Sequence, residues 1–255
     1  MIITKSRREL DKMAAAGAIH VEVLKRLAAM IEPGITTGEL DAAAERMIRE
    51  RGGIPTFKGY HGFPKSICAS PDHMVVHGIP GDHVLGDGAI ISLDVGVTLD
   101  GWIADGAVTF PVGEVSPVAE RLIAVTRQSL FDAVEQCRPG NRLGDVSNAV
   151  QTTVEDAGLS VVRTLVGHGV GQAMHEDPQI PNFGPPGRGP RLQPGMVLAV
   201  EPMTTVGRPG VVEGDDGWAI YSADGSLAAH FEFTIAITDA GPWILTPRHE
   251  GDDAL

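Results

Sequence analysis

Four carboxylate side chains lie in or directly after apolar segments that are typical of buried strands. They are Asp94, Asp105, Glu201 and Glu232. A buried carboxylate without a partner costs several kcal/mol or becomes protonated. Lysine and arginine are scarce in the same segments, so ion pairs are a poor source of the compensating charge. These four residues therefore predict a site that binds cations.

Two of these carboxylates are predicted to share one face of a β-hairpin. Segments 89–99 and 102–110 flank Asp100-Gly101, a strong hairpin turn signal. With a two-residue turn, Asp94 lies opposite Ala107 and Asp105 lies opposite Gly96. The two aspartates are then diagonal neighbours, with backbones roughly 7–8 Å apart. The alternative is a pair of solvated aspartates on an edge hairpin, and the second pair of carboxylates favours the cation site.

A histidine in a glycine-rich segment adds a nitrogen ligand. The glycines of Gly167-His168-Gly169-Val170-Gly171 allow a close backbone approach, and the segment has neither a dinucleotide fingerprint nor a Walker lysine. One imidazole with several carboxylates suits two divalent ions, such as Co, Mn or Fe, better than a closed structural zinc site. Two adjacent ions lower the pKa of a bridging water and generate hydroxide near neutral pH.

Two further histidines lie in turn-like segments, His77 in 76–80 and His175 in 174–178. Each alone is typical of a surface histidine. Beside a metal site, both become candidate proton donors and substrate-binding groups.

The elements that would position these residues form an internal repeat. The helix breaker Pro33-Gly34 has a counterpart in Pro139-Gly140, and each precedes a helical segment that ends at a glycine. Segments 88–94 and 195–201 both consist of a glycine, an apolar run and a carboxylate. The carboxylates of the two halves therefore occupy matching positions.

Capping signals predict where the helices begin. Ser6 and Thr36 are each followed by a glutamate at capping-box spacing, and they open helices that run to about residues 30 and 52. Ser116 followed by Pro117 is typical of an N-cap and first helical position, and that helix runs to about Cys137.

We predict an α+β fold in one domain, 1–255, with two pseudo-symmetric αα-β halves, roughly 1–115 and 116–255. Antiparallel sheets of the two halves would lie side by side around a central cleft. The segment 181–194 is rich in proline and glycine, and we predict an irregular loop rather than a linker, because a strand pattern resumes directly after it.

Composition limits the classes of function. The 255 residues are 43% hydrophobic and 21% charged, as in an ordinary globular protein, and the net charge of −13 argues against nucleic acid as a partner. No apolar run is long enough to span a bilayer, and the N-terminus lacks the apolar region of a secretion signal. The two cysteines, Cys68 and Cys137, do not suggest a disulfide framework. We therefore predict a cytoplasmic protein that does not bind membranes.

The five candidate ligands resemble, in type and order, those of the pita-bread metallopeptidases. They are Asp94, Asp105, His168, Glu201 and Glu232. Four further segments resemble type I methionine aminopeptidases of the short bacterial form, and the resemblance covers nearly the whole chain. These segments are 60–66 (YHGFPKS), 77–80 (HGIP), 167–171 (GHGVG) and 175–178 (HEDP).

This resemblance implies a pita-bread fold and a centre with two divalent ions. Asp94 would chelate one ion, Asp105 and Glu232 would bridge both, and His168 and Glu201 would complete the second. A bridging hydroxide would attack the carbonyl of an N-terminal methionine whose amine binds at the ion held by Asp94.

The resemblance also implies roles in catalysis and substrate binding. Glu201 would be the general base, His175 would stabilise the tetrahedral intermediate, and His77 would contact the scissile amide. Aromatic and sulfur groups suit a methionine side chain, and the implied pocket consists of Tyr60, Phe63, Cys68 and Trp218, with Phe57 and Met174 nearby. For Cys68, a role as a small buried filler is equally compatible.

The implied substrates are nascent polypeptides with a small second residue. We expect a monomer. Action on nascent polypeptides is compatible with a transient contact with the ribosome. Four positions depart from the family pattern: Gly96, Gly106, Met174 and Phe233 stand where threonine, threonine or serine, an aromatic residue and histidine are usual.

Two other functions remain open from the residues. A proline-directed pita-bread peptidase uses the same ligands, but it usually carries a sizeable domain before the catalytic one. A metal-free pita-bread interaction protein would be expected to have lost ligands, and none of the five is altered here.

Overall fold

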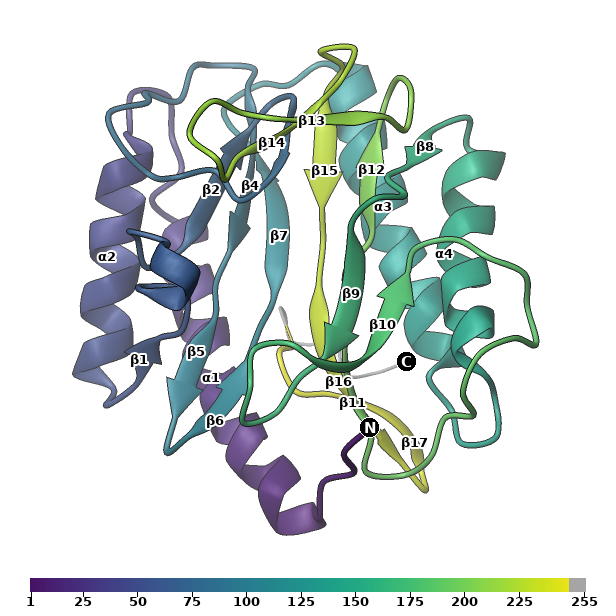
Figure 1. The fold of residues 1–255 in the computed structure, drawn as a ribbon. Coiled ribbons are helices and arrows are strands. Elements are labelled where there is room, and N and C mark those ends of the chain that lie inside the picture. The colour runs from purple at the N-terminus through teal and green to yellow at the C-terminus, as the bar shows by residue number, and fades with distance from the viewer. Residues whose placement is uncertain (248–255) are drawn as a thin grey trace.

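A computed structural model describes residues 1–247 of the chain. Within these residues, one pair of long helices precedes the strands of each half. The pairs are α1 (Arg7–Ala28) with α2 (Thr37–Glu50), and α3 (Pro117–Gln136) with α4 (Leu143–Asp156). Figure 1 shows the first pair on the left of the molecule and the second pair on the right, with the strands between them.

The predicted capping residues begin these helices. Thr36 forms a complete capping box, because its hydroxyl accepts from the Glu39 N–H and the Glu39 carboxylate accepts from the Thr36 N–H. At Ser6, the Glu9 carboxylate accepts from both the N–H and the hydroxyl. The Ser116 hydroxyl accepts a hydrogen bond from the Ala119 N–H at the start of α3. Local hydrogen bonding therefore fixes the helix starts, as predicted.

The strands of the first half form two antiparallel three-stranded sheets, ordered β2-β4-β7 and β1-β5-β6. Their bounds are β1 (Ile54–Pro55), β2 (Cys68–Pro71), β4 (Ile90–Asp94), β5 (Val97–Leu99), β6 (Trp102–Ala104) and β7 (Ala107–Pro111). The short 3₁₀ helix η1 (Tyr60–Gly62) lies between β1 and β2.

The strands of the second half form a five-stranded sheet, β10-β9-β11-β16-β17, and a three-stranded sheet, β15-β12-β8. Their bounds are β8 (Ser160–Val161), β9 (Val166–Gly169), β10 (Glu176–Pro181), β11 (Val197–Val200), β12 (Met203–Thr205), β15 (Ala228–His230), β16 (Phe233–Thr238) and β17 (Gly241–Ile244). A last antiparallel sheet joins the halves, because β3 (Met74–Val76) pairs with β14 (Ile220–Ser222), which pairs with β13 (Val211–Glu213).

The hairpin around Asp100-Gly101 has the predicted register, with Asp94 opposite Ala107. The strands are not continuous as predicted, however, because the first is interrupted before the turn, at residues 95–96, and the second after it, at residues 105–106. The outer part, β4 with β7, and the turn part, β5 with β6, belong to different sheets. The second half has a similar break, since β11 pairs with β16 and β12 pairs with β15 on either side of Glu201 and Glu232.

The two halves are joined along a seam between β7 and the segment 228–238. The backbones of Ala107 and Glu232 exchange hydrogen bonds, with N···O distances of 3.4 and 2.9 Å. The Thr109 hydroxyl donates to the His230 carbonyl and accepts from the His230 N–H, both at 2.9 Å. The seam therefore places the carboxylates of both halves next to each other.

Buried side chains of both halves form one main apolar cluster, which includes Leu27 and Ile91 from the first half and Leu130 and Ile235 from the second. Antiparallel sheets and flanking helices confirm the α+β prediction. The assignment of 1–255 to one domain with two repeated halves stays a prediction, and its residues 248–255 lie outside the described part. In the described part, no helix has the length and apolar character to cross a membrane.

Candidate metal centre and active site

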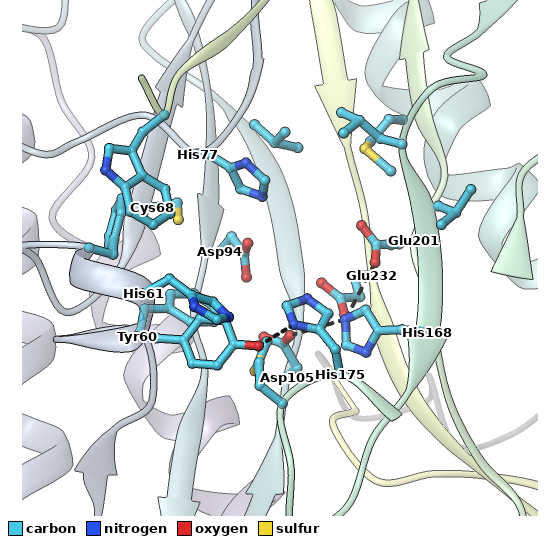
Figure 2. A pocket seen from close by; sticks show the side chains of 18 of the residues that line it. Tyr60, His61, Cys68, His77, Asp94, Asp105, His168, His175, Glu201 and Glu232 are labelled. Carbon is cyan, nitrogen blue, oxygen red and sulfur yellow. Dashed lines mark hydrogen bonds and ion pairs between the residues drawn. The ribbon is translucent and has the colours of Figure 1, made fainter. Parts of the chain in front are cut away.

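One cavity of about 360 Å³ is lined by every residue for which the sequence predicted a role. The predicted ligands in its lining are Asp94, Asp105, His168, Glu201 and Glu232. The predicted catalytic and substrate-binding residues in its lining are His77, His175, Tyr60, Phe63, Cys68 and Trp218. Figure 2 shows the acidic side chains and His168 converging from strands of both halves.

The breaks in the strands place the carboxylates of the site. Asp94 is the last residue of β4, and Asp105 lies between β6 and β7. The Asp105 N–H donates to the Thr234 hydroxyl at 3.0 Å, and that hydroxyl donates to the Asp105 carbonyl at 2.8 Å. A threonine of the second half thus holds the backbone of an acidic residue of the first half.

His168 lies in β9 with its Nε2 atom directed at the carboxylates. Its Nδ1 is 2.9 Å from the Gly169 carbonyl, so Nδ1 carries the proton and Nε2 has a free lone pair. Nε2 lies 3.6 Å from Glu201 Oε1 and 4.0 Å from Asp105 Oδ2. A Cβ at Gly167 or Gly169 would lie within 2.4 Å of a neighbouring carbonyl oxygen, which explains the flanking glycines.

Burial without a compensating charge raises the pKa values of all four carboxyls. Burial first, and then the neighbouring acids, raise those of Asp94, Glu201 and Glu232 well above the ordinary range. Burial raises the pKa of Asp105 to about 7 and lowers that of His168 to about 4. Bound cations would offset the negative charge of these carboxyls and so allow them to ionise beside a neutral imidazole.

Unpaired polar atoms also fit a metal centre. Asp94 Oδ1, Glu232 Oε1 and His230 Nε2 are buried and have no hydrogen-bond partner. Potential ligand atoms of Asp105, His168 and Glu232 lie within 4.8 Å of one another, and so do those of Glu201, His230 and Glu232. Oxygen and imidazole donors at this spacing suit divalent transition-metal ions. The residues present therefore fit the metal ions that the sequence predicted.

The opposite side of the cavity is aromatic and apolar. The rings of Phe63 and Trp218 meet edge to face, with centroids 5.1 Å apart. Cys68 pairs with Asp94 across β2 and β4, and its pKa is raised well above the ordinary value by burial and then by the nearby carboxylates. Cys68 therefore remains a thiol and forms part of an apolar wall.

His175 lies between this wall and the carboxylates. Its Nδ1 is 2.7 Å from the Tyr60 hydroxyl, and its ring centroid is 4.3 Å from that of His168. Burial and then the nearby His61 lower its pKa, so the imidazole is neutral near neutral pH. His61, for which the sequence predicted no role, also lines the cavity.

Sequence reasoning missed His230 as a member of this cluster. Its Nε2 lies 3.6 Å from Glu201 Oε2 and 3.9 Å from Glu232 Oε2, although the side chain does not line the cavity. Only its position two residues before Glu232 could have indicated this role, and the sequence does not reveal the break between β15 and β16 that separates the two residues.

Two of the departures from the family pattern have a structural reason. A Cβ at Gly106 would lie 2.8 Å from the ring of His20, whose Nε2 is 3.0 Å from the Gly106 carbonyl. A Cβ at Gly96 would lie 2.7 Å from the ring of Phe57. In each case, the ring of a neighbouring residue occupies the space that a side chain at the glycine would need.

The chain was compared with known families and proteins. Residues 11–239 match the model of metallopeptidase family M24. Methionine aminopeptidase from Clostridium perfringens and methionine aminopeptidase 1 from Bacillus subtilis are each 52% identical over 246 residues, with 96% of this chain and 99% of the relative covered. The crystal structure of methionine aminopeptidase from Thermotoga maritima matches with a TM-score of 0.95 and 44% identity, covering 96% of this chain and 99% of that one.

Proposed function

This chain belongs to metallopeptidase family M24, and we propose that it removes the N-terminal methionine from polypeptides with a small second residue, with Glu201 as the general base. The predicted pita-bread fold and metal-dependent aminopeptidase activity are confirmed by the family match and the close relatives. The observation that carries the finer proposal is one cavity with buried carboxylates and His168 on one side and an aromatic, thiol-containing wall on the other.

We assign the metal ligands residue by residue. Asp94 would hold one ion, Asp105 and Glu232 would contact both, and His168 and Glu201 would hold the other. When bound, two divalent ions supply hydroxide near neutral pH and polarise the substrate carbonyl. Co, Mn and Fe all suit these ligands, and the unpaired oxygens of Asp94 and Glu232 support a centre of this kind.

Three side chains are proposed to transfer protons or to stabilise the charge that develops on the substrate. Glu201 accepts the proton of the attacking water and delivers it to the leaving amine. The Tyr60 hydroxyl lies 2.7 Å from Nδ1 of His175, and we assign it as the donor. In that tautomer His175 Nε2 carries a proton, which it would donate to the oxygen of the tetrahedral intermediate. His77, at the other side of the cavity, contacts the scissile amide and assists the leaving amine.

The substrate methionine binds against the aromatic wall. Phe63 and Trp218 present ring edges and faces, and Cys68 supplies a polarisable sulfur, all of which suit a thioether side chain. The predictions of a monomer, a ribosome contact and a cytoplasmic location stay predictions.

The test is methionine release from the peptide Met-Gly-Met-Met by chelated protein, repeated after Co, Mn, Fe or Zn is added back singly. Release that requires an added ion supports the proposal. No release by folded protein with any ion would favour the metal-free interaction protein instead.

Second-residue preference gives one further prediction. We expect Met-Ala peptides to be cleaved and Met-Lys peptides to resist cleavage, because the family resemblance implies a narrow cleft beyond the scissile bond that would exclude a bulky second residue. Competition between the two peptides in one reaction, followed by mass spectrometry, measures the ratio of kcat/KM values. Equal rates would contradict the proposed specificity.

His77→Ala tests the division between ligands and catalytic residues. We expect kcat to fall by roughly 10²-fold or more, because a group that assists the leaving amine is lost. The metal content should stay unchanged, as measured by elemental analysis of the purified variant. Loss of metal together with activity would place His77 among the ligands instead.

A further inference from the structure

His230 has the surroundings of a metal ligand rather than those of a hydrogen-bonded core histidine. The residue is only 2% exposed, and its Nε2 has no hydrogen-bond partner. Burial of a polar nitrogen without a partner is unfavourable, so this atom calls for a ligand. This atom is directed at two carboxylates, those of Glu201 and Glu232.

The distances argue for a shared ion. Nε2 lies 3.6 Å from Glu201 Oε2 and 3.9 Å from Glu232 Oε2, beyond the roughly 2.7–3.2 Å of an N–H···O hydrogen bond. Two donors that each lie about 2.1 Å from one ion are roughly 3.0–4.2 Å apart, depending on the angle at the ion. Both separations therefore suit three atoms around one cation.

Glu201 has one imidazole near each of its two oxygens. His168 Nε2 lies 3.6 Å from Oε1, and His230 Nε2 lies 3.6 Å from Oε2. The seam holds the backbone of His230 in place, because the Thr109 hydroxyl bonds both its N–H and its carbonyl. Backbone hydrogen bonds therefore hold His230 beside Glu201.

We propose that His230 is a further metal ligand, which binds a divalent cation through Nε2 together with Glu201 and Glu232. This inference rests on the proposed metal centre and adds a second imidazole to it. An additional nitrogen donor favours Co, Fe and Zn over Mn, which prefers oxygen ligands. This metal centre should therefore discriminate against Mn more strongly than a centre of five ligands with a single imidazole would.

The decisive experiment counts coordinated imidazoles in the Co(II)-loaded protein by proton NMR. Each histidine that binds paramagnetic Co(II) through Nε2 gives one strongly shifted, exchangeable Nδ1–H signal, and burial of both rings slows exchange of these protons with solvent. We expect two such signals in the unaltered protein. His168→Gln should remove one, His230→Gln should remove the other, and His73→Gln, at an exposed histidine stacked on Tyr221, should remove neither.

The outcomes separate this inference from the proposed function. A single signal that only His168→Gln removes would leave the metal centre intact and overturn the role of His230. No shifted signal, with no Co(II) bound, would overturn the metal centre and this inference together. The number of shifted Nδ1–H signals in the unaltered protein distinguishes these results even if a variant fails to fold.

A second readout is metal affinity measured by titration calorimetry. His230→Gln should weaken Co(II) binding by at least about 10-fold, as loss of groups in or around a metal site generally does. Mn(II) binding should weaken less. Equal affinities of His230→Gln and the unaltered protein for Co(II) would overturn the proposal.

Discussion

Replacing Glu201 with glutamine should lower kcat for methionine release by roughly 10²–10⁴-fold. The amide keeps the volume of the side chain but cannot accept a proton from the attacking water or return it to the leaving amine. Its carbonyl can still occupy part of the ligand position between His168 and His230. Initial rates on a Met-Gly-Met-Met peptide, together with metal content, measure the loss.

The matched control is Glu45→Gln. Glu45 lies in α2, forms ion pairs with Arg49 and Lys58, and does not line the cavity. Its replacement should leave kcat nearly unchanged. If Glu201→Gln retained more than about a tenth of the original kcat at full metal content, the proton transfer would have to be assigned to another group.

Addition of divalent ions to chelated protein should raise the melting temperature by roughly 5–10 °C when the ion is present at about 100 times its dissociation constant. An ion that binds only the folded state stabilises that state, and here it also offsets four buried acids. Thermal unfolding followed by circular dichroism measures the shift. The double variant Asp105→Asn, Glu232→Gln should show a much smaller shift, and an equal shift would place the ions elsewhere.

The same acids should make the stability of the chelated protein depend on pH. Burial raises the pKa of Asp105 from 3.8 to about 7, so the folded state binds more protons than the unfolded state between these values. The free energy of unfolding should therefore fall as pH rises from about 4 to about 7. Bound metal should flatten this dependence, and a melting temperature of the chelated protein that stayed constant from pH 5 to pH 8 would contradict the explanation.

Local signals were sufficient to predict much of the fold and the site. Capping boxes determined the helix starts, and the Asp100-Gly101 turn determined which residue faces Asp94. Carboxylates in apolar strands are recognisable because their burial is costly, so the predicted ligands could be grouped before their spatial arrangement was known.

Long-range features could not be predicted in this way. The strand breaks at residues 95–96 and 105–106 lie beside the rings of Phe57 and His20, which leave no room for a side chain at Gly96 and Gly106 and are far from them in the sequence. The pairing of β3 with β14 and the seam through Thr109 arise only when the two halves pack. His230 became a candidate ligand for the same reason, since its nearest carboxylates include Glu201, which lies between β11 and β12.

The seam has a consequence for the order of folding events. The ligands of the centre come from both halves, and Glu232 meets Ala107 only after β7 and the 228–238 segment have come together. Such pairing of distant segments is slow and is completed late. Metal ions can therefore bind only near the end of folding, so they should slow the unfolding rate much more than they accelerate folding. The supply of metal should therefore control how long the chain stays folded rather than how fast it folds.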